Sequence, residues 1–115
     1  MKKAFLLLAT LAFISLSAIP EFEHTVLVTI KGPDQYLAQF TIDKIVDGNK
    51  EPVTRPEVLC TEGKESVINK EVGNDGYTIT ALVFKENSTM KIRTSIIVQE
   101  NNEVVYIADD EFDIE

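Results

Sequence analysis

Apolar and polar residues alternate with a period of two along much of the chain. The clearest case is residues 90–99, where one set of alternate positions is almost wholly apolar and the other is largely polar. Residues two apart in a strand share a face, so this segment is predicted to be a strand with one buried and one wet face. Residues 77–84 have a similar pattern, and the polar residues 85–89 between the two segments predict a hairpin. A lone hairpin is marginal in water, so further strands must cover its apolar face.

Other segments have the same character and are separated by turn-forming residues. The further predicted strands are residues 22–31, 36–46, Glu57–Thr61, Glu65–Val72 and 104–108. Residues 51–56 contain two prolines and are predicted to be irregular or an edge segment, because proline lacks the N–H that a central strand donates. About seven short strands with regular turn signals and no helical period predict an all-β fold. We expect a small antiparallel sandwich, immunoglobulin-like or similar; a small barrel is the alternative.

The first eighteen residues have the three parts of a secretory signal peptide. Lys2 and Lys3 precede an apolar segment, and the small residues Ser15, Ser17 and Ala18 supply a cleavage site after Ser17 or Ala18. An uncleaved membrane anchor is the alternative, but the apolar run is shorter than the roughly 20 residues that span a bilayer. The sequence therefore predicts a signal peptide at residues 1–18, a single domain at 19–108 and an acidic tail at 109–115. We expect the mature protein to be secreted or periplasmic, and not embedded in the membrane.

The charge of the chain narrows the choice of partners. The full sequence has a net charge of −8, and removal of Lys2 and Lys3 leaves 9 basic against 19 acidic residues, a net charge of −10. Coulomb repulsion disfavours nucleic acid and anionic lipid as partners. About 97 residues would remain, enough for one domain with its own hydrophobic core. Cys60 is the only cysteine, so no disulfide within the chain can support that core.

Cys60 and His24 are the two candidates for chemistry, and we interpret Cys60 as a structural residue and His24 as a surface residue. Cys60 shares a face with Val58 in an apolar strand, where a free thiol behaves as a small hydrophobic group. A nucleophilic cysteine needs a base, and nothing in the sequence places His24, the single histidine, beside it. Zinc sites draw on three or four ligands, which one histidine and one cysteine do not supply. His24 is therefore predicted to be a surface residue, and no catalytic, cofactor-binding or metal-binding residue is assigned.

The acidic tail and a possible glycosylation triplet each have a structural interpretation and a functional one. The tail at residues 109–115 has five carboxylates, but their spacing does not match a calcium-binding loop, and we expect it to be solvated. Phe112 and Ile114 alternate with the acids, so the tail extending the last strand or docking on a partner is the alternative. The triplet Asn87-Ser88-Thr89 fits the glycosylation acceptor pattern in a predicted hairpin loop, and it matters only in a host that glycosylates exported proteins.

Residues 55–98 also carry a family resemblance. A proline, Pro56, precedes a short strand, a turn with Gly63 and a second short strand, and a long amphipathic strand follows at residues 77–84. This order is similar to a segment of bacterial secretin-type proteins. The resemblance covers under half of the mature chain, and it implies an all-β fold and an envelope location. It brings no site residues with it.

Together these features predict a small exported protein that is not an enzyme and that acts by binding. Its partner is expected to be a protein of the cell envelope or the extracellular space, and exposed strand edges would serve such binding. The alternatives are a subunit of a larger envelope or secretion assembly, an enzyme inhibitor, or an enzyme whose site is assembled from residues distant in sequence. A cavity lined by Cys60, His24 and a carboxylate would favour an enzyme.

Overall fold

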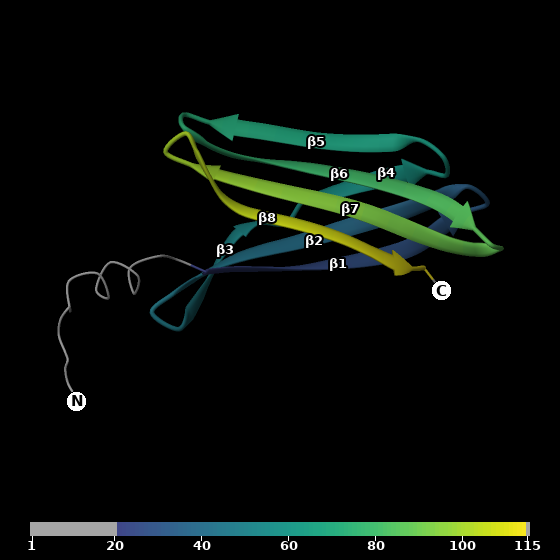
Figure 1. Cartoon of the computed structure of the whole chain (residues 1–115), viewed down its shortest axis with the longest axis horizontal. Coiled ribbons are helices and arrows are strands. Elements are labelled where there is room, and N and C mark those ends of the chain that lie inside the picture. The colour runs from purple at the N-terminus through teal and green to yellow at the C-terminus, as the bar shows by residue number, and fades with distance from the viewer. Residues whose placement is uncertain (1–20, 115) are drawn as a thin grey trace.

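The computed structural model describes residues 21–114. The predicted signal peptide and its cleavage site lie outside the described residues. Eight antiparallel strands form two sheets, which Figure 1 shows as two stacked layers. The predicted all-β sandwich is confirmed.

The first sheet is formed by the N-terminal half of the described chain. Its strands are β1 (Glu21–Gly32), β2 (Gln35–Val46), β3 (Asn49–Thr54) and β4 (Glu57–Thr61). Pro33-Asp34 connects β1 to β2, and Asp47-Gly48 connects β2 to β3. Asp47 and Gly48 have positive φ angles of 53° and 80°, as expected for a two-residue turn whose twist suits a hairpin.

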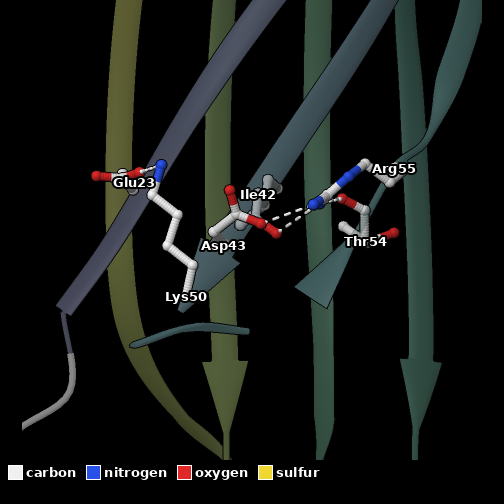
Figure 2. Close-up of polar contacts among 6 residues, drawn as sticks. All are labelled: Glu23, Ile42, Asp43, Lys50, Thr54 and Arg55. Atoms are coloured by element: carbon white, nitrogen blue, oxygen red, sulfur yellow. Dashed lines mark hydrogen bonds and ion pairs between the residues drawn. The ribbon is translucent and has the colours of Figure 1, made fainter. Parts of the chain in front are cut away.

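β3 and β4 lie end to end along the same side of β2. β3 pairs with the last residues of β2, and β4 pairs with the first residues. The pairing of β3 with β2 shifts register between Pro52 and Thr54, and Arg55-Pro56 separates β3 from β4. The predicted irregular or edge segment is therefore an edge strand, β3, followed by a break. Arg55 stabilises this break by donating to the carbonyl oxygens of Ile42 and Thr54 and to Oδ1 of Asp43, at 3.2, 2.9 and 2.8 Å (Figure 2).

The second sheet is a continuous meander of four strands. They are β5 (Glu65–Val72), β6 (Asp75–Glu86), β7 (Thr89–Glu100) and β8 (Glu103–Asp113), in that order across the sheet. The central pair, β6 and β7, is the hairpin predicted at residues 77–99, with longer strands than the sequence indicated. Its turn is Asn87-Ser88, and both residues have positive φ. Asn101 and Asn102 have the same feature in the turn between β7 and β8.

A short connection after β4 takes the chain from the first sheet to the second. Gly63 lies in this connection with a φ of 83°, which favours glycine, and its N–H donates to the carbonyl of Val83 at 2.8 Å. The N–H of Glu62 donates to the carbonyl of Asp34 at 3.0 Å, so the connection is held by both sheets. Each sheet therefore consists of strands that are consecutive in sequence, without the Greek-key connections of immunoglobulin domains.

The core lies between the two sheets and consists of the alternate, inward-facing residues of the strands. β2 and β7 contribute most of the fully buried side chains, with β6 beside them. The buried hydrophobic residues are Tyr36, Ala38, Phe40, Ile42, Cys60, Ile79, Ala81, Val83, Ile92, Ile96, Val98 and Ile114. The period of two in the sequence therefore identifies the two faces of the central strands.

The acidic C-terminal residues belong to the sandwich. β8 continues to Asp113, and Ile114 is buried, with its N–H donating to the carbonyl of Met90 at 2.8 Å. The expectation of a solvated tail from residue 109 is therefore wrong for the described residues, and the alternative of an extended last strand is correct. Strand pairing with β7 and the burial of Phe112 and Ile114 against the core hold the segment in place.

Candidate functional site

His24 lies between the sheets and connects them. It is on β1, and its side chain points inward toward β8, where Tyr106 and Asp110 point back toward it. The distance from Nδ1 of His24 to the hydroxyl oxygen of Tyr106 is 2.6 Å, and the distance from Nε2 to Oδ2 of Asp110 is also 2.6 Å. Phe22 packs against the Tyr106 ring, with 5.4 Å between the ring centroids. The three polar side chains form one hydrogen-bonded group, which we name the His24 cluster.

The chemistry of the partners defines how the His24 ring is hydrogen-bonded. An ionised carboxylate only accepts hydrogen bonds, so Nε2 donates to Asp110. In the neutral ring Nδ1 then accepts a hydrogen bond from the Tyr106 hydroxyl. Burial raises the pKa of that hydroxyl, and the negative charges of Asp110 and Glu23 raise it further. Both ring nitrogens are therefore already in use within the protein.

The His24 cluster corrects the prediction of a surface histidine. Only 16% of the His24 side chain is exposed. The alternation of β1 places His24 on the same face as Val26 and Val28, which pack against the core. The sequence pattern therefore indicates that the His24 side chain points inward. Asp110 was not identified as its partner, because the sequence does not reveal which strand of the opposite sheet lies over β1.

Cys60 is remote from the His24 cluster. It lies on β4, whereas His24 lies on β1, and β2 runs between these two strands. The thiol is fully buried, as expected for a structural residue. Burial raises its pKa, and a hydrogen bond with Ser66 acts in the opposite direction with a smaller effect. The structure therefore does not bring together the cysteine and the histidine that a thiol nucleophile and its base would require.

A cavity of about 230 Å³ opens at the end of the sandwich where β3, β5 and β6 approach one another. It is lined by Val53, Thr54, Lys70, Val72, Asp75, Gly76, Tyr77, Val98, Gln99 and Glu100. Neither Cys60 nor His24 contributes to it. The hydroxyl of Thr54 donates to that of Tyr77 at 3.1 Å across this space, so two of its polar groups already satisfy each other.

The carboxylates near the C-terminus lie on opposite faces of β8. Asp110 faces inward to His24, while Glu111 and Asp113 face outward, where they form ion pairs with Arg93 and Lys91. This arrangement separates groups that are adjacent in sequence. Among residues 21–114, no group of three or more potential ligands could hold a metal ion. The glycosylation triplet begins in the exposed turn between β6 and β7.

The edges of the two sheets differ in how they are protected against pairing with another chain. Charged side chains, proline and short length are the usual means of protection. β8 has four acidic residues in its last five positions, β5 has Glu65, Lys70 and Glu71, β3 contains Pro52, and β4 has only five residues. Residues 104–108 of β8 also form an uncharged run, with Val104, Val105 and Ile107 exposed, but the acidic residues follow it directly. β1 has no such protection over residues 25–30, whose sequence is Thr-Val-Leu-Val-Thr-Ile. Such an uncharged run with five β-branched residues favours pairing with a further strand.

β1 is also the outermost strand of its sheet. It pairs with β2 on one side, and within residues 21–114 no strand pairs with its other side. About half of its backbone N–H and C=O groups therefore point toward a free edge. Leu27 is 63% exposed on the outer face, and Ile30 is 58% exposed near the end of the strand. We name residues 25–30 of β1 the open edge and treat it as the candidate binding site.

No protein-family model matches this chain, and neither a curated protein nor a solved structure matches it. The resemblance of residues 55–98 to secretin-type proteins therefore stays a prediction. Residues 21–114 contain no helix that is long and apolar enough to cross a membrane.

Proposed function

We propose that this protein is a small exported binding protein without catalytic activity, and that its open edge accepts an extended strand from a partner protein. The partner would lie in the cell envelope or outside the cell, consistent with the signal peptide expected at residues 1–18. The observation that carries the proposal is the uncharged six-residue run at the free edge of β1. The edges of β3, β4 and β5 contain proline, are short or carry charges, and the shorter uncharged run of β8 at residues 104–108 leads directly into four acidic residues.

The physical basis of binding would be strand addition. A strand that pairs with β1 satisfies the backbone groups at the free edge, and each hydrogen bond contributes about 0.5–1.5 kcal/mol net. Exposed Leu27 and Ile30 would lose water-accessible apolar surface in the same step. Main-chain bonds supply affinity in such complexes, and the side chains of alternate residues supply specificity.

Electrostatics support a neutral or basic partner strand. The mature chain would carry a net charge of −10, and the acidic end of β8 belongs to the same side of the sandwich as β1, as the contact of His24 with Asp110 indicates. A strongly acidic segment would be repelled from this side. A neutral or basic segment would be tolerated or attracted, especially at low ionic strength.

We assign the His24 cluster a structural role in this proposal. A histidine that acts as a base must reach a substrate, and the His24 side chain is only 16% exposed and does not line the cavity at the end of the sandwich. The cluster connects β1 to β8, and this contact would hold β1 in the sandwich when a partner strand pairs with it. Strand pairing at an edge would equally serve a subunit of an envelope assembly, which is the alternative function.

The test is the capture of partners from the native envelope fraction by the processed protein and by two matched variants. Leu27→Lys introduces a charge on the outer face of the open edge, and Val67→Lys introduces the same charge at a position of similar exposure, 58%, on edge strand β5. We expect Leu27→Lys to lose the partner and Val67→Lys to retain it. Equal capture by both variants would contradict the proposal. Circular dichroism of both variants verifies that the fold is retained.

A further inference from the structure

We propose that a second copy of this chain occupies the open edge, with two β1 strands pairing antiparallel around a two-fold axis at Leu27. This inference rests on the proposed function, because it assumes that the open edge accepts a strand. The joined sheet would run from β3 and β4 of one copy, through both β1 strands, to β3 and β4 of the other. The partner strand of another protein would compete with this dimer.

The sequence of β1 is self-complementary in this register. Residues directly opposite in an antiparallel pair lie on the same face, so each residue must meet one of the same parity. With Leu27 on the axis, Leu27 meets Leu27, Thr25 meets Thr29, and Val26 meets Val28. Cross-strand pairs of threonines and of aliphatic side chains stabilise antiparallel sheets.

Opposite charges meet at the two ends of the same pairing. Glu23 lies four residues before Leu27 and Lys31 lies four residues after it, so Glu23 of each copy comes opposite Lys31 of the other. Lys31 follows Ile30 at a bulge and forms no ion pair within residues 21–114. Within the described part of the chain, Glu23 forms one ion pair, with Lys50 on the surface at 2.7 Å (Figure 2), and an exposed pair of this kind is readily exchanged.

The dimer would be weak and dependent on concentration. One pair of strands is a small interface, and two mature chains, each with an expected net charge of −10 after removal of Lys2 and Lys3, repel one another. Leu27 provides the main apolar contact, because its exposed side chain would meet its own copy at the axis. The pairing would also cover the uncharged run that otherwise favours uncontrolled strand association.

Cysteine cross-linking tests the position of the axis. We expect Leu27→Cys to form a disulfide-linked dimer under mild oxidation, because opposite residues in an antiparallel pair come close enough for a disulfide. Thr25→Cys is the matched control on the same face, and we expect at least about tenfold less cross-linking, because its copies lie on opposite sides of the axis. Native Cys60 is fully buried and should not react. Equal cross-linking at both positions, or none at Leu27→Cys, would overturn the proposed register.

Charge reversal followed by sedimentation equilibrium tests the pairing itself. Glu23→Lys and Lys31→Glu each place like charges opposite one another, and each should weaken the dimer by at least about tenfold. The double variant restores opposite charges and should bring the dissociation constant back to within about threefold of the original. Lys50→Gln is the control that removes only the contact within one copy, and it should leave the dimer intact.

The outcomes separate this inference from the proposed function. A chain that stays monomeric up to about 100 μM, yet captures a partner that Leu27→Lys loses, would overturn self-pairing and leave strand binding in place. A dimer that charge reversal does not affect would overturn the proposed pairing. Failure of Leu27→Lys to alter either dimerisation or partner capture would overturn both proposals.

Discussion

Nε2 of His24 and Oδ2 of Asp110 lie 2.6 Å apart, although 86 residues separate them and they belong to different sheets. The same histidine is also bonded to Tyr106, so one side chain of β1 connects to two residues of β8. These contacts fix the strand that carries the open edge to the opposite layer of the sandwich.

Removing the His24 side chain should therefore destabilise the fold. We expect His24→Ala to lower the free energy of unfolding by about 1–3 kcal/mol, because it removes two hydrogen bonds and leaves two polar groups with poorer partners. Thr25→Ala, on the exposed face of the same strand, should change it by less than about 0.5 kcal/mol. Urea denaturation measures both values. Effects of His24→Ala and Asp110→Ala that add without coupling would contradict the described contact.

Thr94 offers a stabilising substitution. Its side chain is 1% exposed, and its hydroxyl oxygen has no hydrogen-bond partner within the described chain. Valine has a similar shape without the hydroxyl, so Thr94→Val should raise the free energy of unfolding by about 1 kcal/mol. Thermal denaturation measures the change. A clear loss of stability would indicate that the hydroxyl is hydrogen-bonded in solution.

Cys60 should react slowly with thiol reagents while the protein is folded. The thiolate is the reactive form, and burial both raises the thiol pKa and blocks access to the sulfur. We expect negligible labelling by a chromogenic disulfide reagent at pH 8 in native buffer and rapid labelling in concentrated denaturant. Labelling in native buffer at the denatured rate would contradict the buried position.

Tyr106 should contribute to a loss of stability at alkaline pH. Because its pKa is raised in the folded protein, the folded state holds the phenolic proton more tightly than the unfolded chain does. This contribution is fully present below the unfolded pKa of about 10, and it is lost as the pH rises through the folded value. Tyr106→Phe removes the titrating group, so its free energy of unfolding should decline less steeply above about pH 10. The native protein and the variant both retain Cys60, so the difference between them reports on Tyr106. Identical alkaline profiles would refute the assignment.

The faces of the strands could be predicted from the sequence, because side-chain direction in a strand follows position alone. Ile92, Ile96 and Val98 are buried as the alternation indicates, and Arg93 is exposed. Strand ends were less predictable. Phe112 and Ile114 gave a weak signal for a longer β8, and the high density of acidic residues around them pointed to a solvated tail.

The contacts between the sheets could not be predicted. Whether β8 lies over β1 depends on the short connection after β4 and on the twist of each sheet, and neither is encoded in a local pattern. Asp110 therefore resembled its neighbours in an acidic run, although it is the one whose carboxylate bonds to His24. The inward position of His24 was predictable from Val26 and Val28, but its partners were not.

The most direct test of the account is hydrogen–deuterium exchange of the processed protein, alone and in complex with its captured partner. Strand addition at the open edge predicts that backbone amides of residues 25–30 gain protection on binding, because they form new hydrogen bonds. Amides of β5 should exchange at the same rate in both states. Added protection of amides in β5 or in other strands, with no change in the exchange rates of residues 25–30, would contradict the claim that β1 binds the partner.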